Sequence, residues 1–281
     1  MKLRKAAVAG TFYPSDKGDL EKAIQTSFKY WESHSLPSID PNAKVYGAVV
    51  PHAGYQYSGI VAAAVYSKLK KADTVIIIGP NHTGEGPFVS VFPDGYWETP
   101  LGQVEVDSEI AKSILSKSQF AQKDERAHQH EHSVEVHLPF LQTIMQGAKV
   151  VPIAIMHTSP NERFYSVCKD LGMSIYSAIK SSGKNVLILA STDLTHYELK
   201  ERAESKDNIA ISDIMKLDET GLLKSVSEYR ISMCGFGGVT ATLIACKALG
   251  AKKAEKVAYM TSWNYTGGNS PVVGYGGLII L

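Results

Sequence analysis

Three histidines follow short apolar runs that are typical of buried strands. They are His52 after Val45–Val50, His82 after Thr74–Gly79, and His196 after Asn185–Ala190. Imidazole binds transition metals and exchanges protons near neutral pH. The carboxyl ends of parallel strands lie at one edge of a sheet, where the ligand sites of open α/β sheets collect. We therefore expect the three histidines to belong to one site.

Cys234 is a candidate of a second kind, because it stands just before an expected helix over Gly237–Leu249. The N-terminus of a helix lowers the pKa of a nearby thiol and favours the thiolate, which binds metals. Cys168 and Cys246 fall within amphipathic helical stretches, so we expect both to be buried as small apolar side chains. Three cysteines without a CxxC pair predict neither a disulfide framework nor a structural zinc ribbon.

The densest group of titratable residues is the segment HQHEHSVEVHLP at 128–139. We expect His128 and His130 to lie in a solvated loop. Glu131 and His132 are better site candidates, because Ser133 can then cap the helix that follows. A metal site needs only three or four ligands, so the histidines of this segment cannot all be equivalent.

The expected helix over Ser133–Gln146 contains two residues that the pattern does not explain. Pro139 would lie inside it, where proline kinks or delays a helix. His137 is left unassigned, as either a site residue or a buried polar side chain.

Apolar, β-rich runs alternate with longer amphipathic stretches. The expected strands are Val45–Val50, Thr74–Gly79, Val89–Phe92, Lys149–Ile155, Asn185–Ala190, Val257–Ser262 and Val272–Leu281. The expected helices are Asp19–His34, Ser58–Lys70, Asp107–Ser118, Ser133–Gln146, Asn161–Ser182, Ala203–Leu217 and Gly237–Leu249. Several strands are apolar on both faces, as in a sheet that helices cover on both sides.

This alternation predicts an α/β fold with three αβα layers around a mixed, mostly parallel sheet. The last two strands come without an intervening helix, so part of the sheet is expected to be antiparallel. The stretch Leu36–Pro41 is short enough to be a loop, and no repeat or linker divides the chain. We therefore expect a single domain over residues 1–281.

The composition is that of an ordinary soluble protein. Of 281 residues, 44% are hydrophobic and 20% are charged, and 29 Lys and Arg balance 28 Asp and Glu to a net charge of +1. This balance argues against a nucleic-acid partner. No apolar run is long enough for a signal-peptide core or a membrane span, so we expect a cytoplasmic protein without membrane contact.

Seven segments resemble those of the Memo family, in order and over nearly the whole chain. They are AGTFYP at 9–14, PHAGY at 51–55, GPNH at 79–82, EHSVEVHLPF at 131–140, STDLTH at 191–196, MCGFGG at 233–238 and GYGGLII at 274–280. The second and fourth segments together are specific to the family. The family's fold is similar to that of LigB-type class III extradiol dioxygenases, non-haem iron enzymes that open catechol rings.

The resemblance implies a set of roles for residues of this chain. His52 and His82 match the two metal-binding histidines, and Cys234 stands where the dioxygenases have a carboxylate ligand. His196 matches their acid/base histidine, with Asp193 beside it.

The resemblance extends to three residues around this set. His132 is similar to a second catalytic histidine of the dioxygenases. Phe12 and Tyr55 are the substrate-binding residues that it implies, and Phe12 stands where some Memo proteins have a tryptophan.

Three functions are compatible with these residues. The first is an oxidoreductase with iron(II), although a thiolate beside two histidines also suits zinc or copper. The second is a non-catalytic module that binds a peptide or a small molecule. The third is a zinc hydrolase with a metal-bound water as nucleophile. The substrate and the oligomeric state do not follow from the sequence.

Overall fold

The computed structural model describes residues 2–40, 42–268 and 270–281. Its main sheet contains β2 (Gly47–Val50), β3 (Thr74–Asn81), β4 (Val89–Val91), β7 (Ala121–Lys123), β8 (Lys149–Met156), β9 (Val186–Ser191), β10 (His196–Glu198), β11 (Ala254–Thr261) and β12 (Val272–Ile280). The helical segments are α1 (Lys17–Tyr30), α2 (Tyr55–Tyr66), α3 (Ser108–Lys117), α4 (Arg126–Gln129), the 3-10 turn η1 (Glu135–His137), α5 (Leu138–Ile144), α6 (Glu162–Ser182), α7 (Lys200–Met215), α8 (Glu219–Glu228), α9 (Phe236–Leu249) and α10 (Trp263–Thr266).

The centre of the main sheet is a parallel block of four strands. Within the described residues, the strand order is β10-β12-β2-β9-β3-β8-β4-β7, and β11 pairs with β12. Strands β2, β9, β3 and β8 run in one direction, whereas β12 and β4 flank them in the opposite direction. The carboxyl ends of β2, β9 and β3 therefore lie side by side at one edge, as the sequence predicts for an α/β fold with a mixed sheet.

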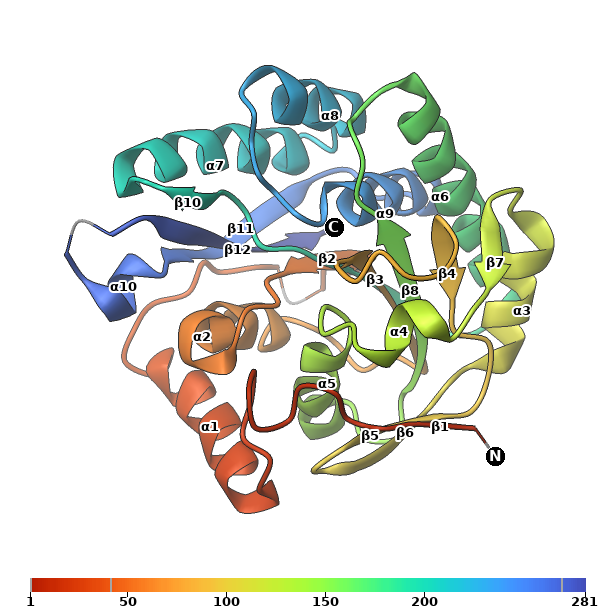
Figure 1. Ribbon diagram of the computed structural model, residues 1–281, viewed down its shortest axis with the longest axis horizontal. Helices are drawn as coiled ribbons and strands as arrows, with labels where there is room; N and C mark the ends of the chain where they lie inside the picture. The colour runs from red at the N-terminus through yellow and green to blue at the C-terminus, as the bar shows by residue number, and fades with distance from the viewer. Residues whose placement is uncertain (1, 41, 269) are drawn as a thin grey trace.

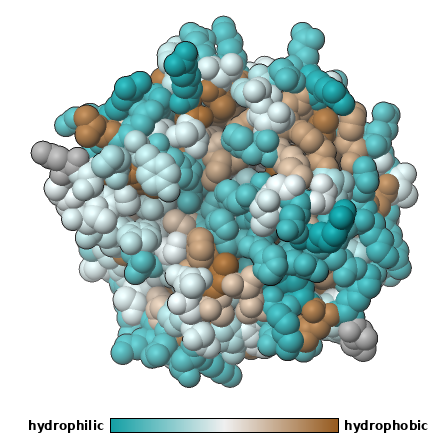
Figure 2. All heavy atoms as spheres, viewed as in Figure 1, coloured by the Kyte–Doolittle hydropathy of each residue, from teal (hydrophilic) through white to brown (hydrophobic). Residues whose placement is uncertain are grey.

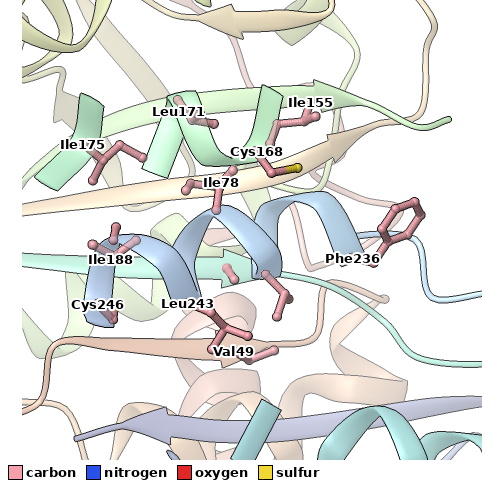
Figure 3. Packing of buried hydrophobic residues seen from close by; sticks show 14 of the residues in the cluster. Val49, Ile78, Ile155, Cys168, Leu171, Ile175, Ile188, Phe236, Leu243 and Cys246 are labelled. Atoms are coloured by element: carbon pink, nitrogen blue, oxygen red, sulfur yellow. The ribbon is translucent and has the colours of Figure 1, made fainter. Parts of the chain in front are cut away.

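Helices cover both faces of this sheet, in three layers (Figure 1). In β3, Val75 and Ile77 pack in one core cluster with α1, α2 and α5, whereas Ile76 and Ile78 pack in the other with α6 and α9. Figure 3 shows part of the second cluster, in which Ile78, Ile188 and Val49 of the sheet surround α9 and Leu243 of that helix lies next to Val49. Because successive side chains of a strand point to opposite faces, apolar runs such as TVIII fill both cores.

A small second sheet holds the start of the chain. It consists of β1 (Leu3–Arg4), β5 (Tyr96–Thr99) and β6 (Gly102–Glu105), with β1 parallel to β5. These strands are too short to give a periodic signal, and the sequence pattern does not predict them.

The expected strands and helices are confirmed with shifted ends, except in one region. Residues 133–146 do not form one helix, because η1 precedes α5. Ser133 is not a helix cap; its hydroxyl donates to the Pro80 carbonyl over 2.9 Å. Pro139 lies in the first turn of α5, where its missing N–H breaks no helical hydrogen bond, so the helix is not kinked.

Hydrophobic residues on the face shown in Figure 2 occur as separate patches among hydrophilic ones. No helix in the described ranges has the length and apolar character needed to cross a bilayer.

The expected loop over Leu36–Pro41 is confirmed for residues 36–40, and Pro41 lies outside the described residues.

The buried Asp107 side chain at the start of α3 gives a stability test. It accepts hydrogen bonds from Ile110 N at 3.1 Å, Thr74 Oγ1 at 2.6 Å and Lys184 Nζ at 2.9 Å. We expect Asp107→Ala to lower the free energy of unfolding by about 1–3 kcal/mol, because it removes the cap and leaves buried donors unpaired. Asp107→Asn keeps an acceptor and is expected to lose less. Urea denaturation measures both, and equal stability of wild type and Asp107→Ala would contradict the assignment.

Candidate metal centre

Three histidines meet at the carboxyl edge of the parallel block. One ligand atom each from His52, His82 and His132 lies within 4.8 Å of the other two. The ring centroids are 5.3 Å apart for His52 and His82, 5.4 Å for His52 and His132, and 4.5 Å for the stacked pair His82 and His132. Three convergent imidazoles are a typical donor set for a transition metal.

The sheet places two of these side chains. His52 follows β2 and His82 follows β3, with β9 between the two strands. The predicted convergence of these histidines is therefore confirmed. His132 comes from the segment between α4 and η1, so its position depends on how that segment packs over the sheet edge.

The buried carboxylate of Glu131 holds two of the three rings. It accepts hydrogen bonds from His82 N at 2.6 Å, His82 Nδ1 at 2.9 Å and Ser133 N at 2.8 Å, and His132 Nδ1 lies 3.4 Å from it. Burial alone would raise the pKa of this carboxyl, but the hydrogen bond from His82 and the nearby imidazoles hold it at about 2. A carboxylate on Nδ1 leaves Nε2 as the ligand atom of a metal-binding histidine.

The third ring is held by a hydroxyl that the sequence patterns did not single out. Ser191 Oγ lies 2.7 Å from His52 Nδ1 and 2.8 Å from His137 Nε2, and it donates to the Ser133 carbonyl over 2.6 Å. His137 is thereby placed behind the cluster, buried, with its Nδ1 2.8 Å from Tyr66 Oη.

Burial keeps two of the three rings, those of His52 and His132, uncharged. It lowers the pKa of His52 well below its usual value and that of His132 to about 4, and the neighbouring imidazoles lower the pKa of His52 further. Both rings are therefore neutral at pH 7. A metal-binding imidazole must be neutral, so this environment favours metal binding.

Cys234 lies beside the cluster, next to one member. Its Sγ is 3.2 Å from His52 Nε2 and 3.3 Å from Asp193 N. The expected thiolate is wrong for the metal-free protein, because burial and the charge of Asp193 raise the pKa of the thiol. A Cβ on Gly235 would lie 2.2 Å from the Ser191 carbonyl oxygen, so glycine is needed to bring Cys234 this close.

Asp193 and His196 lie at the same edge. Asp193 Oδ1 accepts the backbone N–H of His52 at 2.9 Å, and burial raises the pKa of its carboxyl to about 6. His196 Nδ1 lies 2.9 Å from the Ser232 carbonyl. Because a carbonyl only accepts, Nδ1 carries the proton and Nε2 is left as a proton acceptor. Electrostatic interaction with His196 lowers the pKa of both His52 and Asp193, so His196 belongs to the surroundings of the cluster.

Phe12 and Tyr55 connect the cluster to a cavity. The ring of Phe12 lies 4.4 Å from that of His132, and Tyr55 N donates to the Phe12 carbonyl over 2.8 Å. Both residues line a cavity of about 580 Å³ between the N-terminal segment, α1 and α2. The Tyr55 hydroxyl donates its hydrogen to the Val136 carbonyl over 2.7 Å. Their binding of a substrate stays a prediction.

Comparison with known proteins places the chain in a family. A family model described as "Memo-like protein" matches residues 4–279. The chain belongs to the Memo family. It is 45% identical to a MEMO1 family protein of Desulfurococcus amylolyticus over 99% of both chains, and 44% identical to one of Sulfolobus acidocaldarius over 97% of both. A further relative, from Methanothermobacter thermautotrophicus, is 41% identical over 97% of this chain and 98% of its own.

In the segment 128–139, the burial of one histidine differs from the sequence prediction. His130 is exposed as expected, but His128 is fully buried and not a solvated loop residue. Its ring lies 5.7 Å from those of both Phe92 and Trp97. These two aromatic residues come from a distant part of the chain. The prediction that His128 is exposed was therefore wrong, because it used only the polarity of neighbouring residues in the sequence. Burial lowers the pKa of His128 to about 4.

This burial predicts that the Memo-family protein loses stability in acid. His128 is protonated more readily in the unfolded chain, so its contribution is complete above pH 6.5 and falls as the pH drops towards 4. At pH 5 the loss is on the order of 2 kcal/mol for this residue. We expect His128→Leu to flatten the fall in unfolding free energy between pH 7 and 5, as measured by urea denaturation. The exposed control His130→Leu should retain the wild-type slope; equal slopes for both variants would contradict the prediction.

Proposed function

We propose that this Memo-family protein is a non-haem iron(II) oxidoreductase whose metal is held by His52 and His82. The observation that carries the proposal is the group of three imidazoles whose ligand atoms lie within 4.8 Å of one another. The buried acceptors Glu131 and Ser191 occupy the Nδ1 atoms of His82 and His52, which leaves the Nε2 atoms for a metal.

The third ligand has two candidates. His132 belongs to the close group of three, whereas Cys234, which the family resemblance implies, lies 3.2 Å from His52 Nε2. An all-imidazole set suits iron, zinc and copper, and a thiolate shifts the preference towards softer metals. Zinc and copper are therefore the alternatives that metal analysis distinguishes.

The surrounding residues fit a reaction at such a metal. Bound iron(II) with open positions supplies electron transfer and dioxygen chemistry. In the proposed reaction His196, held by the Ser232 carbonyl at Nδ1, accepts a proton at Nε2, and Asp193 accepts the backbone N–H of His52. The cavity that Phe12 lines is the proposed binding site for a small molecule or a short peptide, and the ring of Phe12 lies between it and His132.

The unpaired cysteines support a cytoplasmic location. Cys168, Cys234 and Cys246 form no disulfide with one another, and reduced thiols are typical of proteins in the cytoplasm. A reducing compartment also protects a thiol next to iron from oxidation.

The first test is the metal content of protein purified without oxygen. We expect close to one iron per chain in wild type and loss of most of it in His52→Ala and His82→Ala, because each variant removes a ligand. The matched control is His130→Ala, which removes an exposed histidine outside the cluster. Inductively coupled plasma mass spectrometry measures the content. An iron content in both ligand variants equal to that of wild type would overturn the assignment of the site. One zinc per chain in place of iron would favour the zinc hydrolase. Binding of a peptide or small molecule that persists after the metal is removed with a chelator would favour the non-catalytic binding module.

The second test identifies the third ligand with cobalt(II) in place of iron. A cobalt–thiolate bond gives charge-transfer absorption in the near ultraviolet, and binding then also releases the thiol proton. If Cys234 is the ligand, Cys234→Ser abolishes the absorption and the proton release. If His132 is the ligand, wild type lacks the absorption, and His132→Ala binds cobalt at least about tenfold more weakly.

A further inference from the structure

The hydrogen bonds around Ser191 indicate which nitrogen of each neighbouring imidazole carries the proton. Three groups surround its hydroxyl oxygen: the Ser133 carbonyl, His52 Nδ1 and His137 Nε2. A hydroxyl has one hydrogen to donate and two lone pairs to accept with. The carbonyl can only accept, so the single hydrogen of Ser191 points to Ser133.

Both imidazole nitrogens must then donate to Ser191. His52 therefore carries its proton on Nδ1, and His137 carries its proton on Nε2. The opposite nitrogen of His137 is free to accept, and the Tyr66 hydroxyl lies 2.8 Å from it. Every donor has an acceptor in this arrangement. The four side chains are at most 2% exposed, and an assignment in which Ser191 donates to an imidazole instead would take from the Ser133 carbonyl the hydrogen bond that Ser191 gives it.

The environment of the other His52 nitrogen agrees with this assignment. With the proton on Nδ1, Nε2 carries a lone pair, and its neighbour at 3.2 Å is Cys234 Sγ. The Cys234 thiol can donate to this lone pair, and the Asp193 carbonyl, 3.6 Å from Sγ, is its other acceptor.

We propose that Ser191 is a positioning residue that fixes His52 in the Nδ1–H tautomer and so presents its Nε2 lone pair to the centre. His137 supports Ser191 as a second donor and Tyr66 holds His137 in turn, so the buried chain from Tyr66 to His52 is one unit. The role at a metal rests on the function proposed above, whereas the tautomer of His52 is a property of the metal-free protein.

The consequence for affinity follows from what each tautomer offers a metal. The Nε2–H tautomer of His52 has no lone pair on the nitrogen that faces the cluster, so it cannot bind there. Loss of a hydrogen-bond partner of a metal-binding histidine lowers metal affinity by about 10- to 100-fold.

The experiment measures tautomers and affinity separately. Two-bond ¹H–¹⁵N correlation spectra of the metal-free, ¹⁵N-histidine-labelled protein distinguish the tautomers, and cobalt(II) titration gives the Kd. In wild type we expect His52 with its proton on Nδ1 and His137 with its proton on Nε2. Ser191→Ala should give His52 a mixture of tautomers and raise the Kd about tenfold or more. The control Ser174→Ala removes a buried hydroxyl from α6 and should change neither quantity.

The results distinguish failure of the proposal about Ser191 from failure of the proposed metal function. A wild-type His52 with its proton on Nε2 would overturn the proposal, even if Ser191→Ala does not fold. The proposal would also be overturned if Ser191→Ala had the same His52 tautomer and the same Kd for cobalt(II) as Ser174→Ala. If the tautomers are as expected but wild type binds no cobalt(II), the proposal about Ser191 holds and the proposed metal function fails.

Discussion

Each ring of the histidine cluster depends on a buried oxygen atom at its Nδ1. Glu131 supplies this oxygen for His82 and lies next to His132, and Ser191 supplies it for His52. One ligand atom of each ring lies within 4.8 Å of the other two before any metal is present. Neighbouring lone pairs are unfavourable without a cation, so the surrounding structure must hold the rings in place. The stability of the fold is thus used to prepare a site for a cation.

The segment that carries Glu131 is itself fixed by the start of the chain. Arg4 donates to the carbonyls of His128 and Glu131 and forms a buried ion pair with Glu135. The Glu135 carboxylate also accepts from the backbone N–H groups of Ala7 and Val8. A buried ion pair stabilises only when its remaining hydrogen bonds are made, and here they are. The N-terminal strand therefore helps to support the histidine cluster, although it lies outside the main sheet.

The sequence predicted those parts of the site that depend on residue patterns within one segment of the chain. His52 and His82 follow strands that are recognisable by their apolar runs, and parallel strands must end at one edge, so their meeting could be foreseen. The burial of His128 could not, because its aromatic neighbours are distant in sequence. The thiol of Cys234 was expected to ionise from its place before a helix, but desolvation outweighs the helix effect and is a tertiary property. Ser191 gave no signal, because its role depends on three partners from separate segments.

The position of β12 has a consequence for how the chain reaches this structure. The strand pairs with β2, with β10 and with β11, and Leu278 lies opposite Val49. The parallel block therefore has an unpaired edge at β2 until residues from the far end of the chain arrive. Pairings between distant residues form slowly, because a long loop must close first. During synthesis, β2 and its apolar side chains would wait for β12, which makes this edge the part of the nascent chain most exposed to wrong pairing.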